Sequence, residues 1–251
     1  MSRLWSAART ENKETAPVNG GRRSRVTHPG VVPPVYITGA AYTLEVGLNR
    51  VSVYVDGFNL YYGLKDRHGR RYLWLDLQAL ATSLLRPGQV LQSVTYFTAR
   101  VRDDPDALRR QSDYLDALST HSPLVRIVNG RFQEKDRSCR HCGHRWTVFE
   151  EKETDVNIAI SLVEDAVGDR YDTAILVSGD SDLIPAIKAM KRLAAPKRII
   201  VAFPPNRHSN ELKRVADGFL YVRIDKVRNA QLPEQVVNRT GLTLSRPKHW
   251  T

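Results

Sequence analysis

The chain has 251 residues, of which 41% are hydrophobic, and it carries a formal net charge of +11 at pH 7. This length supports one sizeable α/β domain with extensions or two small domains, and the hydrophobic fraction excludes a largely disordered chain. No stretch approaches the ~20 apolar residues that a membrane span needs, and the N-terminus lacks the order of a signal peptide. We therefore expect a soluble, cytoplasmic protein.

The positive charge is spread over three regions of the chain. Residues 1–49 carry +3, residues 227–251 carry +3, and residues 50–226 carry the remaining +5 of the total of +11. The middle region also contains the acidic cluster considered below, so its outer surface is more basic than this number indicates. A basic surface around an acidic focus suits a polyanion held over metal ions. The alternative is that the basic ends only aid solubility.

The middle region alternates between predicted strands and helices. In chain order, the pattern predicts a strand over 51–56 ending in a DGFN turn, a helix over 76–85, a strand over 92–101, a helix over 104–121, a strand over 124–132, a helix over 150–167, a strand over 173–180, a helix over 181–194, a strand over 198–203, a helix over 208–217 and a strand over 219–224. Asp76 and Asp104 are the predicted N-caps of the first two helices. Continuous apolar strands indicate a mainly parallel sheet covered by helices on both faces.

The two ends of the chain and one insert lack this alternation. Residues 1–49 are expected to form a flexible N-terminal extension, and residues 227–251 a C-terminal tail, because neither has a sustained apolar period. Residues 134–149 form a polar insert that contains both cysteines. The domain proper is therefore predicted to span residues 50–226.

Acidic residues follow two of the predicted strands. Asp56 closes the first strand, Asp180 and Asp182 close the VSGDSD strand, and Asp155 lies near the start of the long helix. The carboxyl ends of parallel strands form one edge, where ligands bind at the topological switch point. Crowded carboxylates raise one another's pKa unless a cation compensates, and Mg²⁺ or Mn²⁺ suits an all-oxygen site. The alternative for a single Asp at a strand end is helix N-capping.

A metal site of this kind predicts a definite chemistry. It can bind a phosphodiester, lower the pKa of a bound water and stabilise the leaving oxygen, with one or two metal ions. The sequence therefore predicts hydrolysis of a phosphodiester by in-line attack.

Three blocks of the sequence are centred on these acids: YVDGFNLYYG (54–63), EEKETDVNIAISLV (150–163) and ILVSGDSDLIPAIK (175–188). They resemble the signature blocks of the NYN domain, a branch of the PIN-like nuclease superfamily, in particular its LabA-like bacterial group. FPPNRHSNELKRVADGF (203–219) resembles the C-terminal block of the same family. The resemblance implies a PIN-like three-layer α/β/α sandwich and metal-dependent cleavage of RNA.

The same resemblance implies roles for single residues. Asn59, which follows the first acid, is implied to orient a metal-bound water or phosphate. Ser178 and Ser181 are candidate hydrogen-bond donors to phosphate oxygens, with turn and cap chemistry as the alternative. The implied metal-binding acids are Asp56, Asp155, Asp180 and Asp182.

Further residues are candidates for contact with RNA. Lys152, predicted on the same helical face as Asp155, and Arg207 and His208 after the RIIVAF strand are candidate phosphate contacts. Aromatic candidates for stacking on unpaired bases are Phe58, Tyr61, Tyr62 and Trp74. The alternatives are that the aromatic residues belong to the core and that the cations are merely solvated.

The two cysteines of the chain lie in one short motif, SCRHCGHRW. Cys139 and Cys142 have the CxxCG spacing of one half of a zinc knuckle, and His144 is a candidate third zinc ligand. The fourth ligand could be His141, a distant histidine or a residue of another chain. If zinc binds, we expect it to fold the insert rather than to act in catalysis. The alternatives are redox chemistry and a polar loop without metal.

The sequence thus predicts a metal-dependent ribonuclease that acts on single-stranded RNA and could form a homodimer. The alternative is a non-catalytic RNA-binding or regulatory module on the same fold. A dehalogenase-type phosphatase is excluded because Asp56-Gly57-Phe58 stands where a DxD pair is required. The glycine-rich motifs of P-loop and dinucleotide-binding enzymes are absent from the sequence.

Overall fold

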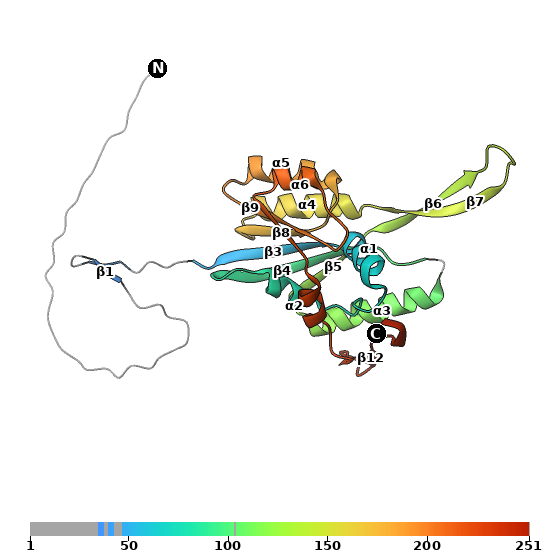
Figure 1. Cartoon of the computed structure of the whole chain (residues 1–251), viewed down its shortest axis with the longest axis horizontal. Coiled ribbons are helices and arrows are strands. Elements are labelled where there is room, and N and C mark those ends of the chain that lie inside the picture. Colours follow the sequence, from blue (N-terminus) through green and yellow to red (C-terminus); the bar gives the residue numbers. More distant parts are fainter. Residues whose placement is uncertain (1–34, 38–39, 43–46, 103, 251) are drawn as a thin grey trace, which may run out of the picture. The chain divides into compact units, whose positions relative to one another are not determined.

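The computed structural model describes residues 35–37, 40–42, 47–102 and 104–250, and it describes side chains for 47–102, 104–147 and 152–250 (Figure 1). The chain divides into two units, Met1–Val46 and Gly47–Thr251. In the first unit, β1 (Val35–Ile37) pairs antiparallel with β2 (Ala40–Tyr42). The rest of the predicted N-terminal extension, apart from 47–49, lies outside the described residues. The second unit holds the α/β domain.

A six-stranded sheet with only parallel pairings forms the centre of this domain, which confirms the predicted fold class. The strand order is β10-β9-β8-β3-β4-β5. The strands are β3 (Asn49–Asp56), β4 (Gln89–Thr98), β5 (Val125–Asn129), β8 (Thr173–Val177), β9 (Arg198–Phe203) and β10 (Gly218–Tyr221). The central strands β3 and β8 are apolar at successive positions because helices cover both faces of the sheet.

Two apolar cores lie on opposite faces of the sheet (Figure 1). Along β3 the side chains alternate: Val53 and Val55 belong to one core, and Tyr54 belongs to the other. One core is covered by α1 (Gly57–His68), α2 (Leu77–Leu84), α3 (Pro105–His121) and α7 (Ile224–Asn229), and the other by α4 (Thr154–Val167), α5 (Ile184–Leu193) and α6 (Asn210–Val215). The result is a three-layer α/β/α sandwich. Across the described ranges, no helix is both long and apolar enough to cross a membrane.

The order of the strands fixes where a ligand site can form. From β3 the chain builds outward through β4 and β5, and it then returns to the other side of β3 to add β8, β9 and β10. The topological switch point therefore lies between β3 and β8, where the connections leave the sheet in opposite directions. Asp56 ends β3 at this edge, and residues 178–182 follow β8 at the same edge.

Two local predictions about the sheet edge were wrong. The predicted DGFN turn is the start of α1, whose N-cap is Asp56. The glycines in its sequence lower helix propensity, but Leu60 and Leu64 are buried against the sheet and stabilise the helix. The helix predicted from residue 150 begins at Thr154, because the preceding residues pair as a hairpin of β6 (Arg131–Ser138) and β7 (Arg145–Lys152).

The prediction of a C-terminal tail was also wrong. Residues 227–250 contribute β11 (Gln235–Val237), β12 (Thr243–Ser245) and the 3₁₀ turn η2 (Lys248–Trp250). The Trp250 ring lies 6.3 Å from the ring of Trp74 and 6.2 Å from that of Tyr114, and Trp74 Nε1 donates a hydrogen bond to the Pro233 carbonyl (2.7 Å). The buried apolar residues of this segment lie singly along the chain, so the sequence shows no apolar periodicity of 2 or 3.6 residues.

An ion pair at the opposite edge of the sheet joins the starts of β3 and β8. Arg50 Nη2 lies 2.8 Å from Asp172 Oδ1, and the Arg50 backbone N–H donates to Asp172 Oδ2 (2.8 Å). These hydrogen bonds from Arg50 hold the pKa of Asp172 well below its ordinary value. A carboxylate with a lowered folded-state pKa stabilises the fold above the unfolded-state pKa, and this stabilisation is lost as the pH falls further.

We predict that Asp172→Asn lowers the free energy of unfolding at pH 7 by on the order of 1 kcal/mol, because solvent partly screens this half-exposed pair. The penalty should be constant above about pH 5 and shrink as the pH falls below about 4. Urea unfolding at several pH values measures this, with the exposed Asp116→Asn on α3 as the matched control. A penalty that does not change with pH would contradict the assignment.

Candidate functional site

Asp56 is the most deeply placed acid at the switch point. Its side chain is 2% exposed. Its Oδ1 accepts a hydrogen bond from the Asn59 backbone N–H (3.0 Å), and its Oδ2 accepts from Asn59 Nδ2 (2.7 Å) and Ser178 Oγ (2.8 Å). Burial raises the pKa of Asp56, the hydrogen bonds oppose this rise, and the nearby charge of Asp180 adds to it. The Asp56 carboxylate is therefore held in place at a cost in desolvation.

Ser178 connects the ends of the two central strands. It is fully buried, and its hydroxyl donates to Asp56 and accepts from the Asp180 backbone N–H (3.0 Å). Asp180 Oδ1 in turn accepts from the Asp182 backbone N–H (2.9 Å), which starts the 3₁₀ turn η1 (Ser181–Leu183). The Ser178 hydroxyl is used inside the site, so it performs the turn chemistry that was the alternative to phosphate contact. Ser181 lies next to Asp180 in η1.

Asn59 bridges the same two strand ends from α1. Its Nδ2 donates to Asp56, and its Oδ1 accepts from the Gly179 backbone N–H (3.2 Å). Both ends of the amide therefore have partners, which fixes the orientation of the side chain and of the Asp56 carboxylate. In this structure Asn59 is a residue that positions Asp56.

Asp155 reaches the same edge by another route. It is exposed in the first turn of α4, and α4 contacts both β3 and η1. Because α4 leads into the parallel strand β8, it must begin at the carboxyl edge of the sheet. Lys152, in contrast, is the last residue of β7. Glu153, which lies between Lys152 and the start of α4, has a φ of 79°, so the strand does not continue into the helix. The prediction that Lys152 and Asp155 share a helical face was therefore wrong.

Three of the acids at this edge, Asp56, Asp180 and Asp182, have no ion-pair partner among the described residues. Within 47–102, 104–147 and 152–250, no lysine, arginine or histidine forms an ion pair with Asp56, Asp180 or Asp182. Asp165, which is also buried, pairs with Arg170 at 2.7 Å. Asp56, Asp180 and Asp182 are therefore oxygen donors without a cationic side chain paired to them in the described part of the chain.

This donor set fits a hard divalent cation, which prefers carboxylate oxygens. The fit is partial in the present arrangement. In the described part of the chain, no group of three or more histidine, cysteine, aspartate or glutamate side chains is close enough to hold a metal ion. Asp155 and Asp182, which are exposed at the same edge, are the candidates for further ligands.

Two basic residues lie against the turn after β8. A Cβ placed on Gly179 would lie 3.0 Å from Arg207 Cβ and 3.1 Å from the His208 backbone nitrogen. Arg207 and His208 therefore pack against Gly179, the residue that precedes Asp180. Arg207 Nη2 also pairs with Asp66 Oδ2 at 2.7 Å, which partly neutralises its charge.

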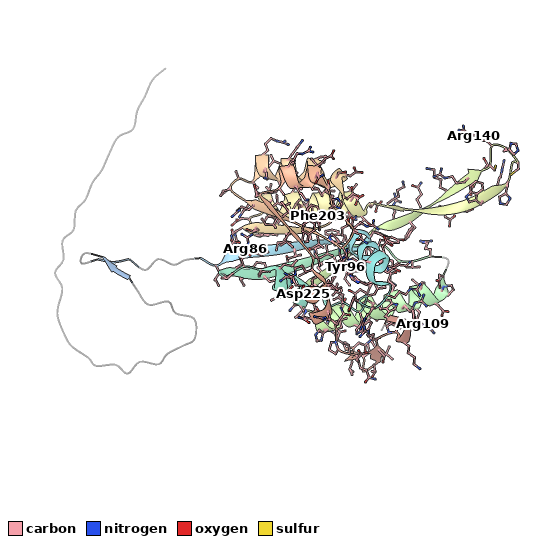
Figure 2. The ribbon with its side chains drawn as sticks, viewed as in Figure 1. Arg86, Tyr96, Arg109, Arg140, Phe203 and Asp225 are labelled. Carbon is pink, nitrogen blue, oxygen red and sulfur yellow. The ribbon has the colours of Figure 1, made fainter. Side chains whose placement is uncertain are left out.

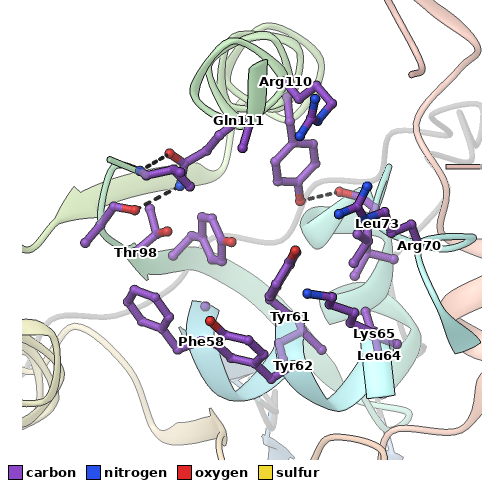
Figure 3. Close-up of a pocket in the computed structure, with 18 of the residues that line it drawn as sticks. Phe58, Tyr61, Tyr62, Leu64, Lys65, Arg70, Leu73, Thr98, Arg110 and Gln111 are labelled. Atoms are coloured by element: carbon purple, nitrogen blue, oxygen red, sulfur yellow. Dashed lines mark hydrogen bonds between the residues drawn. The ribbon is translucent and has the colours of Figure 1, made fainter. Parts of the chain in front are cut away.

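A cavity of about 620 Å³ opens beside the start of α1 (Figure 3). Gly57 and Phe58, the neighbours of Asp56, belong to its lining, and none of the four predicted metal ligands does. Figure 3 shows α1 presenting Phe58, Tyr61 and Tyr62 below the helix that carries Arg110 and Gln111. The lining also includes Leu60, Leu64, Lys65, Arg70, Tyr96, Tyr114 and Trp250.

The aromatic lining was only partly predictable. Phe58, Tyr61 and Tyr62, candidates for stacking on bases, line the cavity. Trp74 is fully buried, so for this residue the alternative, a place in the core, is the correct one. Tyr96 was missed, and burial raises the pKa of its hydroxyl to about 12. The missed residues come from the segment 70–77, from β4, α3 and the β6–β7 hairpin, and from the C-terminal segment. These parts of the chain meet only in the folded structure.

Comparison with known proteins identifies the family. The NYN domain model matches residues 50–225, about the predicted extent of the domain. The chain belongs to the NYN domain family. It is 30% identical over 217 residues to 6-hydroxy-3-succinoylpyridine 3-monooxygenase HspA from Pseudomonas putida, covering 73% of this chain and 68% of that protein. A crystal structure of a protein of unknown function from Vibrio parahaemolyticus is 20% identical, covering 70% of this chain and 94% of that one, with a TM-score of 0.47.

The β6–β7 hairpin, residues 131–152, is inserted within this NYN domain and is called the cysteine hairpin below. Cys139 and Cys142 lie at its tip and are free thiols. The backbone N–H groups of Cys142 and His141 donate to the Cys139 sulfur and lower the pKa of that thiol. The ring of His144 stacks on Trp146, with centroids 5.9 Å apart.

The close packing at the start of α1 gives a prediction for the NYN domain. A Cβ on Gly57 would lie 2.4 Å from the Phe97 carbonyl oxygen, which is backbone and cannot move aside cheaply. We expect Gly57→Ala to lower the free energy of unfolding by about 1–3 kcal/mol, despite the higher helix propensity of alanine. Urea unfolding measures the change, and Gly47→Ala, whose Cβ would have no neighbour within 4 Å, is the control. Equal stability of the two variants would show that α1 is not packed this closely.

Proposed function

We propose that the protein is a metal-dependent ribonuclease that hydrolyses RNA phosphodiester bonds. The observation that carries this proposal is the buried Asp56 carboxylate, joined through Ser178 to the Asp180 turn and lacking an ion-pair partner among the described residues. A buried carboxylate without a counter-charge is costly for a fold, so such a group is expected where a bound cation supplies the charge. Membership of the NYN family supports the same reading.

In this proposal Asp56 and Asp180 hold Mg²⁺ or Mn²⁺, and Asp155 and Asp182 at the same edge complete the ligand set. The bound cation would neutralise the carboxylates and polarise a phosphodiester placed against them. Asn59 and Ser178 keep the Asp56 carboxylate in one orientation through their hydrogen bonds. This support reduces the reorganisation needed when the cation binds.

The surroundings of the acids suit a polyanion. Arg207 and His208 lie against the turn after β8, and Lys152 and Ser181 lie on elements that adjoin the same edge. Such residues can bind phosphates without reading the base sequence. The chain carries a net charge of +11, which favours binding of nucleic acid over binding of neutral ligands.

The aromatic cavity favours single-stranded RNA as the substrate. It is open beside Asp56, and its size is that of a small-ligand site. An unpaired base can turn into such a cavity and stack on Tyr61 or Phe58, whereas a base inside a duplex cannot reach it. The non-catalytic alternative, an RNA-binding or regulatory module, requires binding in the same place without cleavage.

We predict that the purified protein cleaves a labelled single-stranded RNA with Mn²⁺ present and not with EDTA. Asp56→Asn and Asp180→Asn should each lower the cleavage rate by about 100-fold or more, because each removes a negatively charged ligand of the cation. Asp116→Asn, on the exposed side of α3, is the matched control and should cleave like the wild type. Thermal unfolding shows that each variant is folded.

The outcomes of this assay separate the candidates. Equal residual activity in the wild type and Asp56→Asn would indicate contamination and would count against the ribonuclease. Tight RNA binding by all four proteins without any cleavage would favour the non-catalytic module.

We propose, as a second candidate function, that the cavity binds a small aromatic acid. Two observations favour it: the relative from Pseudomonas putida is named for a monooxygenase of 6-hydroxy-3-succinoylpyridine, and the cavity combines aromatic walls with the cations Lys65 and Arg70. Lys65 Nζ lies 5.5 Å from the ring centroid of Tyr61, so a cation and a stacking surface adjoin each other. An aromatic ring with a carboxylate fits that combination.

A substitution in the cavity distinguishes these candidates. If unpaired bases stack there, Tyr61→Ala should raise KM for RNA by about tenfold or more and change kcat less. If the cavity binds an aromatic acid, calorimetric titration with 6-hydroxy-3-succinoylpyridine should show binding that Tyr61→Ala abolishes and Asp56→Asn preserves. Tyr221→Ala, a half-exposed tyrosine outside this cavity, is the control. A Tyr61→Ala variant that changes neither measurement would exclude the cavity from both functions.

A further inference from the structure

The tip of the cysteine hairpin is a second place where metal-ligating side chains gather. Both cysteines of the chain lie there, and residues 140–147 are exposed. The hairpin extends away from the sheet, and Figure 2 shows Arg140 at its far end. The tip residues belong to neither apolar core, so the tip contributes little to the stability of the sandwich. An ordered tip without a core requires another source of stability.

The backbone of the tip is folded around one sulfur. The Cys139 backbone N–H donates to the His144 carbonyl (2.8 Å), and the Gly143 N–H donates to the Cys139 carbonyl (2.9 Å). Gly143 has a φ of 74°, which a glycine adopts without strain. The N–H groups of His141 and Cys142 point at the Cys139 sulfur. This turn places two cysteines, separated by two residues, in the arrangement that supplies half of a tetrahedral zinc site.

The described residues of this chain do not supply the second half of such a site. In the described ranges, no third histidine, cysteine, aspartate or glutamate joins the two cysteines to make a metal site. His144, the predicted third ligand, stacks its ring on Trp146 instead. The sequence contains no further cysteine. Two more thiolates can therefore come only from another molecule.

The charge around the tip suits a site made of thiolates. Zinc held by four thiolates carries a net charge of two minus, which requires nearby positive charge. Arg137, Arg140 and Arg145 are exposed around the two cysteines. Without metal, these arginines would repel those of a second tip, so two tips should associate only when thiolates and zinc are present.

We propose that Cys139 and Cys142 form a half-site for Zn²⁺ that is completed by the same two residues of a second copy of this chain. The zinc would join two molecules through the tips of their cysteine hairpins. The proposal concerns soft sulfur ligands on the hairpin and does not depend on the ribonuclease assignment at the switch point.

The test uses the full chain, purified under reducing conditions and supplied with zinc alone. We expect about half an equivalent of zinc per chain by metal analysis, and the mass of a dimer by light scattering. A chelator should remove the zinc and return the protein to a monomer. Cobalt substituted for zinc should give the absorption of a site with four thiolates rather than two.

Variants assign the ligands in this experiment. Cys139→Ser and Cys142→Ser should each abolish zinc binding and dimerisation while leaving thermal unfolding of the sandwich unchanged. A double variant, His141→Asn with His144→Asn, is the matched control at the same tip and should retain both properties. The chelator experiment on the wild type tests the same point without any substitution.

Three results would overturn the proposal. The first is one zinc per monomeric chain that is lost in the histidine variant, which would place the whole site within one hairpin. The second is less than about a tenth of an equivalent of zinc per chain. The third is a dimer that persists in chelator and in the cysteine variants.

Discussion

The desolvation of one carboxylate constrains the whole domain. Asp56 is 2% exposed, and its oxygens are held by Asn59 and Ser178 rather than by a cation. This arrangement exists only because β3 and β8 are neighbours at the point where the order of strand addition reverses. Burial and the neighbouring charge of Asp180 both raise the pKa of Asp56, so its ionised form is held at an energetic cost. Proteins keep a buried charged group, despite its energetic cost, where their function uses the charge.

The remainder of the sandwich supports this edge. Asp56 caps α1, so the same carboxylate ends the central strand and starts the helix that brings aromatic rings to the cavity. Trp250 forms part of the cavity wall, although the NYN family match ends at residue 225. The family region therefore supplies the acids, and the segment that follows it contributes to the adjoining cavity.

Our two proposals place two kinds of metal ligand in different parts of the chain. The switch point offers carboxylate oxygens held by a rigid sheet, which favour hard cations such as Mg²⁺ or Mn²⁺. The tip of the cysteine hairpin offers thiols on a projecting ribbon, which favour Zn²⁺. In our proposals the first site acts on substrate and the second joins chains, so each can be removed experimentally without disturbing the other.

The sequence by itself determined the parallel α/β class, the NYN resemblance and the acids at the strand ends, because continuous apolar strands and the residues that close them are local features. Even the caps Asp76 and Asp104 were readable, since capping depends on residues two or three positions away. Only the tertiary structure decided the bridge from Ser178 to Asp56, the helical start of α1 and the packing of Trp250 on Trp74. These depend on contacts between residues far apart in the chain, and a pattern along the sequence carries no record of which strand becomes the neighbour of another.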